Sequence, residues 1–158
     1  MEKLAAEGTP NIKLPRPLLG RAGCDFSFSG LKTAVAQLLA PHEGALPRAL
    51  AADVAASFQQ AVAEVFCDRA RHALAMMPDA RLIVAAGGVA ANTTLRAGLA
   101  GVAAAHGMPL AAPPLRLCGD NAVMVAWAAI ERLRLGVFDG LETGPRPRWP
   151  LDELWGAA

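Results

Sequence analysis

The stretch Leu82-Ile-Val-Ala-Ala-Gly-Gly-Val-Ala-Ala-Asn92 decides the fold of this chain. Residues 81–86 form a short apolar run that is typical of a strand buried on both faces. Gly87 and Gly88 then turn the chain, and a helix is predicted over residues 92–106, with Gly107 suited to its C-terminal cap. A buried strand, a glycine turn and a helix in this order predict an α/β fold.

The regions around this stretch are predicted to be mostly helical. Apolar side chains recur at three- and four-residue spacing, which predicts helices over residues 31–40, 50–77 and 120–135. A second short strand is predicted over residues 108–112. Proline and glycine make residues 1–30 and 136–158 irregular, and residues 11–19 are expected to run extended over a surface.

Two short strands do not make a stable sheet by themselves. The sequence therefore predicts one incomplete domain over residues 1–158, rich in helix and with two short buried strands. The exposed edges of these strands could pair between copies of the chain, which would give a homo-oligomer.

Composition excludes several classes of protein. The chain has 158 residues, of which 54% are hydrophobic and 18% charged, so it can bury a core and is not disordered. A net charge of +1 excludes a global basic surface for nucleic acid. Apolar runs fall short of the roughly 20 residues of a membrane helix, and the N-terminus lacks the apolar segment of a signal peptide. Three widely spaced cysteines argue against a disulfide framework, so a reduced, cytoplasmic protein is expected.

Gly87, Gly88 and Asn92 are the first candidate site. Glycines at the end of a strand let a ligand approach the backbone, and a helix N-terminus beyond them offers free N–H groups to a nucleotide. The alternative is that the glycines only make a tight turn and Asn92 only caps the helix. Spacing alone leaves both interpretations open.

Asp120 is the second candidate, because it lies where a loop enters a predicted helix. A carboxylate there could bind a metal, or it could simply stabilise the first turn of the helix. A metal site needs several protein ligands, and the three histidines (His42, His72 and His106) form no HxxxH pair that could join Asp120.

Lys32 and the arginines near the C-terminus are weaker candidates for contact with an anion. Lys32, in the segment Asp-Phe-Ser-Phe-Ser-Gly-Leu-Lys-Thr at residues 25–33, could meet an anion or could be an ordinary solvated lysine. Ser29 is suited to cap the helix that follows. Trp127 is expected in the core. Four arginines near the C-terminus could contact RNA phosphates or could simply lie near a helix end: Arg132, Arg134, Arg146 and Arg148.

Three motifs together resemble one family. DFSFSGLKT at residues 25–33, AAGGVAANTTLR at 85–96 and LCGDNAVMVAWAAIERLR at 117–134 are similar, in this order and at these separations, to the C-terminal half of the tRNA adenosine threonylcarbamoyltransferases. The tail RPRWPLDEL at residues 146–154 resembles bacterial members. The resemblance implies one lobe of an actin-like, ribonuclease-H-like ATPase fold. It also implies transfer of a threonylcarbamoyl group from threonylcarbamoyl-AMP to an adenosine of tRNA.

The resemblance assigns roles to individual residues. Gly87 and Gly88 match the glycines beside the adenosine, and Asn92 matches a nucleotide-binding asparagine. Asp120 matches one ligand of a divalent metal, iron or zinc, which would act as a Lewis acid. ATP is the alternative nucleotide, and Lys32 is a further candidate for substrate binding. The resemblance names no catalytic residue here, so that assignment stays unknown.

The resemblance also implies what this chain needs from elsewhere. The HxxxH motif and a phosphate-binding glycine loop belong to the N-terminal half of the family, and the isolated chain is expected to be metal-free and inactive. Expected partners are that missing half, in cis or in trans, tRNA and the accessory proteins of threonylcarbamoyladenosine synthesis. The alternatives are a non-catalytic scaffold of the same family and another actin-like ATPase or sugar kinase.

Overall fold

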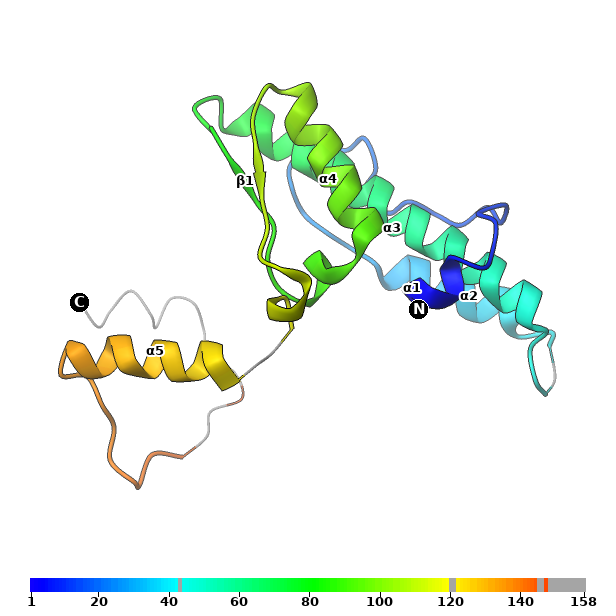
Figure 1. Cartoon of the computed structure of the whole chain (residues 1–158). Coiled ribbons are helices and arrows are strands. Elements are labelled where there is room, and N and C mark those ends of the chain that lie inside the picture. The colour runs from blue at the N-terminus through cyan, green and yellow to red at the C-terminus, as the bar shows by residue number, and fades with distance from the viewer. Residues whose placement is uncertain (43, 120–121, 145–146, 148–158) are drawn as a thin grey trace. The chain divides into compact units, whose positions relative to one another are not determined.

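The computed structural model describes residues 1–42, 44–119, 122–144 and 147. The chain divides into two compact units, Met1–Asp120 and Asn121–Ala158. In the first unit lie the helices α1 (Glu2–Ala5), α2 (Ser29–Leu39), α3 (Arg48–Met76) and α4 (Thr93–Ala105), the strands β1 (Ile83–Val84) and β2 (Leu110–Ala111), and the 3₁₀ helices η1 (Gly88–Ala91) and η2 (Leu115–Leu117) (Figure 1). The second unit contains α5 (Ala122–Arg134).

The 29-residue helix α3 is the scaffold of the first unit, and both α1 and α4 pack against it (Figure 1). Small side chains allow these helices to come close. A Cβ on Gly8, just beyond α1, would lie 2.2 Å from the carbonyl carbon of Ala52, and a Cβ on Gly98 in α4 would lie 2.8 Å from the Cys67 sulfur. The buried residues of α3 are correspondingly small: Ala52, Val54, Ala55, Ala56, Ser57, Ala61, Ala63, Val65 and, as an exception, Arg69.

The irregular N-terminal segment runs along α3, but the prediction that residues 11–19 are extended is wrong for residues 17–19, which lie in a turn where Leu18 has φ +63°. Its donors meet acceptors at α3 positions separated by four, seven and four residues, a spacing that keeps them on one helix face. The contacts join Thr9 N to Asp53 Oδ1 (2.8 Å), Ile12 N to Ser57 Oγ (3.0 Å), Arg16 Nε to Glu64 Oε2 (2.6 Å) and Gly20 N to Asp68 Oδ2 (3.1 Å). We call this set the α3 ladder.

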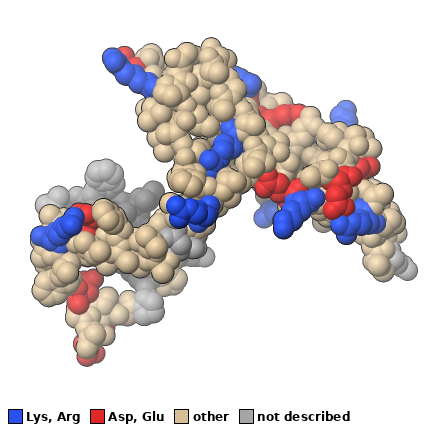
Figure 2. All heavy atoms as spheres, viewed as in Figure 1, with Lys and Arg blue, Asp and Glu red and all other residues tan. Residues whose placement is uncertain are grey.

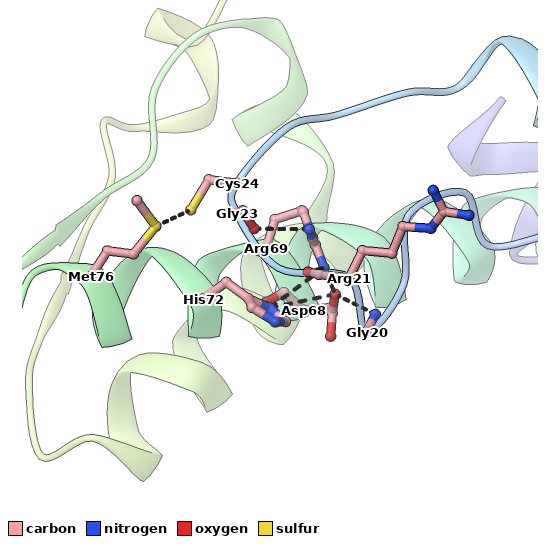
Figure 3. A network of polar contacts seen from close by, with 8 residues as sticks. All are labelled: Gly20, Arg21, Gly23, Cys24, Asp68, Arg69, His72 and Met76. Atoms are coloured by element: carbon pink, nitrogen blue, oxygen red, sulfur yellow. Dashed lines mark hydrogen bonds and ion pairs between the residues drawn. The ribbon is translucent and has the colours of Figure 1, made fainter.

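Arg69 directly follows Asp68, the last acceptor of the α3 ladder, and is 1% exposed. Its guanidinium donates to the carbonyl oxygens of Gly23 (2.9 Å) and Arg21 (2.8 Å), and it also pairs with the Asp68 carboxylate (Figure 3). A buried charge is tolerated when it is paired and hydrogen-bonded, as it is here. The two carbonyl partners of Arg69 come from a loop 46 and 48 residues earlier in the chain.

The sheet consists of two parallel strands in the described part of the chain. Ile83 pairs with Leu110 and Val84 with Ala111, which confirms an α/β arrangement with two short strands. The prediction that both faces are buried is wrong, since Val84 is 67% exposed. The described residues place no second layer over this side chain.

The predicted helices are confirmed with small changes at their ends. The four-residue α1 was not expected within residues 1–30. Ser29 is the first residue of α2 and its side chain makes no cap, because Phe28 occupies the cap position. Gly107 does close α4: it has φ +67°, and its N–H donates to the carbonyl of Ala104 (3.0 Å).

Helix α5 forms as predicted, but its side chains are exposed. Trp127 is 60% exposed in the described structure, so its placement in the core is wrong. The apolar residues that recur with it along the helix are exposed as well: Val123, Ile130 and Leu133. Helical spacing correctly predicted the helix but not what covers it.

No helix among the described residues is long and apolar enough to cross a membrane.

We predict that Arg69→Met lowers the free energy of unfolding by about 1–3 kcal/mol, because two part-buried hydrogen bonds from a charged donor are lost. Urea denaturation at pH 7 measures this change. Arg71→Met, which removes an exposed arginine from the same helix, is the matched control and should stay within about 0.5 kcal/mol of the wild type.

The same pair of variants tests the charge on Asp68. The hydrogen bond from Arg69 holds the pKa of the Asp68 carboxyl below its usual value. A carboxyl of this kind stabilises the fold above its unfolded-state pKa of about 3.9, and that stability is lost as the pH falls through the folded-state pKa. The difference between wild type and Arg69→Met should therefore shrink below about pH 4. An equal dependence of stability on pH in both proteins would contradict this.

Candidate nucleotide-binding turn

The turn after β1 presents bare backbone to solvent. Gly87 has φ +80° and ψ −179°, a conformation that residues with a side chain rarely adopt. Its carbonyl accepts the N–H of Ala90 at 3.0 Å, which starts η1. A Cβ built on Gly87 or Gly88 would meet no atom within 4 Å, so the space above both glycines is open. A flat ligand can therefore reach this backbone.

Asn92 is the N-cap of α4, which confirms the interpretation that its side chain caps the helix. Its Oδ1 accepts the N–H of Leu95 at 3.0 Å. Its Nδ2 donates to Gln59 Oε1 on α3 at 2.8 Å, and Gln59 in turn donates to Thr94 Oγ1 at 2.8 Å. Nδ2 carries a second N–H, so a nucleotide could accept from Asn92 while the bond to Gln59 stays in place.

The N-terminus of α4 is closed by a carboxylate from α1. Glu2 Oε1 accepts the backbone N–H of Thr93 at 2.8 Å and also the Thr93 hydroxyl. These hydrogen bonds lower the pKa of Glu2. The expectation of free N–H groups at this helix end is therefore wrong for Thr93 and Leu95. The accessible part of the site is the glycine turn rather than the helix N-terminus.

A hollow of about 260 Å³ lies beside the turn. Ala85, Ala86 and Val89 line it from the turn, and Phe66 lines it from α3. Arg96 is the one charged residue in a lining that is otherwise apolar. Pockets for complete ligands usually measure about 300–1,000 Å³, so this hollow suits a base better than a whole nucleotide.

The structure does not bring Lys32 to this turn. Lys32 is exposed on α2 and lines a separate apolar groove of about 570 Å³ formed by residues of α1, α2 and α3. None of the residues that line this groove lines the hollow beside the turn. Gly87, Gly88 and Asn92 therefore form one local constellation, and Lys32 stands apart from it.

The metal assignment cannot be built from the described residues. Asp120 lies outside them, and within them no group of three His, Cys, Asp or Glu side chains could hold a metal ion. Its neighbour Cys118 is 3% exposed. The described residues thus do not fit a complete metal site.

Some residues at the site gave no signal in the sequence. Glu2 and Gln59 reach the start of α4 from α1 and α3, and Gln59 also lines a groove of about 680 Å³ between the N-terminal segment, α3 and α4. Cys67 lines the same groove, and burial raises the pKa of its thiol, which makes it a poor nucleophile at neutral pH. The partners of Gln59 and Glu2 at the start of α4 are 33 and 91 residues away in the sequence, so no local motif could reveal these contacts.

The C-terminal arginines were a weak candidate for RNA contact. Arg134 pairs with Glu131 at 2.9 Å and Arg132 with Asp139 at 3.8 Å, while Arg146 and Arg148 lie outside the described residues. On the face shown in Figure 2, basic and acidic side chains are interspersed over the helices of the first unit. This pattern agrees with the net charge of +1.

Comparison with known proteins gives the family. Residues 1–127 match the tRNA N6-adenosine threonylcarbamoyltransferase family, TsaD. The chain belongs to this family. It is 62% identical over 160 residues to the tRNA N6-adenosine threonylcarbamoyltransferase of Gluconobacter oxydans, covering 97% of this chain and 44% of the relative. It is 56% identical to that of Granulibacter bethesdensis, with coverage of 96% and 42%, and 53% identical to that of Sphingopyxis alaskensis, with coverage of 96% and 43%.

Membership in TsaD confirms the resemblance that the three motifs carried. The matched region contains the segment at 25–33, the glycine turn and Asp120. The chain spans less than half the length of these curated relatives. The activity of the complete relatives is therefore a proposal for this chain and not a property of it.

We predict that the amide proton shift of Thr93 titrates with the Glu2 carboxyl. In the wild type its midpoint should lie below the ordinary value of about 4.3, because the Thr93 hydrogen bonds favour the charged form. Nuclear magnetic resonance spectra from pH 2 to pH 7 measure this. Glu2→Gln should abolish the transition, while Glu7→Gln, which removes a carboxylate that pairs with Arg48 instead, should retain it. A midpoint at or above 4.3 would contradict the contact.

Proposed function

We propose that this chain is the nucleotide-binding C-terminal segment of a tRNA N6-adenosine threonylcarbamoyltransferase. Gly87, Gly88 and Asn92 contribute to a site for threonylcarbamoyl-AMP or ATP, and Lys32 is a separate candidate for substrate binding at the groove that it lines. Asp120 supplies one ligand of a divalent metal, iron or zinc. The observation that carries the proposal is the open backbone of the Gly87–Gly88 turn in a chain of the TsaD family.

In the proposed reaction, the exocyclic amine of a tRNA adenosine attacks the carbamoyl carbon of threonylcarbamoyl-AMP. A new C–N bond forms, the bond to the phosphate oxygen breaks, AMP leaves, and the amine loses a proton. The residues of this chain would act on the leaving nucleotide: the glycine backbone would lie against the adenosine, and Asn92 would donate its second amide N–H to it. Lys32 would meet the negative charge of a substrate.

The chain is proposed to be inactive alone. Its sequence contains no HxxxH pair, and a single aspartate does not complete a metal centre. The remaining ligands and the phosphate loop would come from an N-terminal half, in cis or in trans. tRNA and the accessory proteins of the pathway would be its partners, the cytoplasm its location, and one lobe of an actin-like, ribonuclease-H-like fold its complete architecture.

A non-catalytic scaffold of the same family is the second candidate function. It is favoured by one observation: both polar ends of Asn92 are already engaged and Glu2 closes the helix beyond it. Such a chain would keep the fold and its binding surfaces, including strand edges open to pairing between copies, without the transfer chemistry.

Calorimetric titration with AMP tests the proposed site, first on the chain alone and then with the N-terminal half of the Gluconobacter oxydans relative supplied. We expect weak binding to the chain alone, which strengthens when the second half is supplied. Asn92→Ala should weaken it at least tenfold. Asn92→Asp keeps the cap acceptor but loses the amide donor, so it separates nucleotide contact from helix capping. Unchanged affinity in both variants would reduce Asn92 to a structural cap.

The same reconstituted assembly tests the metal assignment. Asp120→Ala should lower its metal content, measured by elemental analysis, and abolish modification of tRNA while leaving the helical circular dichroism signal unchanged. Unaltered metal content would show that Asp120 is not a ligand. Tight assembly of the two halves without tRNA modification would favour the scaffold.

A further inference from the structure

A half-buried arginine on α4 joins two segments that the proposed function treats separately. Arg96 donates to the carbonyl oxygen of Ala90 through Nε (3.0 Å) and Nη2 (2.8 Å). Nη2 also donates to the carbonyl oxygen of Pro113 (3.0 Å) and lies 3.2 Å from the sulfur of Cys118. One guanidinium thus bonds to groups 6, 17 and 22 residues away in the sequence.

The groups on either side belong to the two proposed site segments. Ala90 lies in η1, the 3₁₀ helix that begins at Gly88, and is 6% exposed. Pro113 and Cys118 begin and end the segment that precedes Asp120 in the sequence. The 3₁₀ helix η2 lies within this segment and packs against η1. The proposed nucleotide turn and the approach to the proposed metal ligand therefore share one anchor.

The chemistry of arginine suits this task. Its guanidinium is planar and rigid and presents several donors in fixed directions, so it can hold two carbonyls from different segments at once. A lysine at this position would offer one compact charge on a flexible stem. The carbonyl of Ala90 accepts from two nitrogens of the same guanidinium, which fixes the orientation of η1 as well as its distance.

We propose that Arg96 is a positioning residue that fixes the Gly87–Asn92 turn against the Pro113–Cys118 segment. The link itself is independent of any ligand. Its importance for threonylcarbamoyl transfer rests on the proposed function, in which the turn contacts the nucleotide and Asp120, the second residue after this segment in the sequence, is a metal ligand. Arg96 acts through these two segments and is not proposed to touch the substrate.

Amide hydrogen exchange on the full chain tests the link. The N–H of Asn92 bonds to Val89 and that of Cys118 bonds to Leu115, so these two amides report on the two segments. Arg96→Met should accelerate the exchange of both at least tenfold. The N–H of Ala85, which bonds to Ala111 across the sheet, should keep its rate.

Three further variants separate positioning from general stabilisation. Arg71→Met removes an exposed arginine and should change none of the three amides. Cys118→Ala removes the contacts of the sulfur with Arg96 and with the carbonyls of Pro113 and Pro114, but it leaves the bonds from Arg96 to Ala90 and Pro113, so both segments should remain protected. Arg96→Lys should recover protection of one segment at most. Acceleration of only one segment in Arg96→Met, or equal acceleration of Ala85, would overturn the proposal.

AMP serves as the probe for coupling. In the wild type, AMP bound at the turn should slow exchange at Cys118 as well as at Asn92. In Arg96→Met, saturating AMP should still protect Asn92 but no longer Cys118. Equal protection of Cys118 in both proteins would overturn the proposal. If AMP protects neither amide in the wild type, the proposed nucleotide site fails, and the ligand-free exchange rates still confirm or overturn the link.

Discussion

The hydrogen bonds from the buried guanidinium of Arg69 to the carbonyls of Arg21 and Gly23 are the constraint on which the first unit depends. Residues 9–23 contain no regular secondary structure of their own, so side-chain contacts must hold them on α3. The α3 ladder holds residues 9–20 on the helix, and Arg69 holds Arg21 and Gly23 just beyond it. Phe26 and Phe28 come next and pack against Phe66 of α3, the first tilted at a centroid distance of 4.8 Å and the second stacked at 5.8 Å. The start of α2, and Lys32 with it, is therefore placed by a loop that α3 holds.

Helix α3 organises the candidate site as well. Gln59, two residues after Ser57 of the α3 ladder, connects α3 to Asn92 at the start of α4. Glu2 reaches the same helix start from α1, which itself packs on α3. The glycine turn is thus supported by a helix that is already fastened to the N-terminal segment. A ligand at this turn would meet a rigid backbone, and pre-organisation of this kind lowers the cost of binding.

Local patterns in the sequence predicted the helices α2 to α5, because apolar spacing is a property of neighbouring residues. Gly87 and Gly107 were also predictable, since each has a positive φ that other residues avoid. Arg69, Glu2 and Arg96 were not, because their partners lie 46, 91 and up to 22 residues away. The exposure of Val84 and Trp127 was missed for a related reason: periodicity specifies which residues share a face but not what covers it. The roles of Gly87, Gly88, Asn92 and Asp120 came from the combination of three motifs, and Asp120 lies outside the described residues.

The central claim is that the open glycine backbone after β1 is the part of this chain that meets an adenine nucleotide. Titration of the ¹⁵N-labelled chain with AMP, followed by heteronuclear magnetic resonance, tests it most directly. The account predicts that the largest shift changes fall on the amides of Gly87 and Gly88, with smaller changes along the hollow formed with Phe66. Changes centred instead on Gln60 and Arg71, in the groove between α3 and α4, would contradict it, as would a spectrum that AMP leaves unaltered.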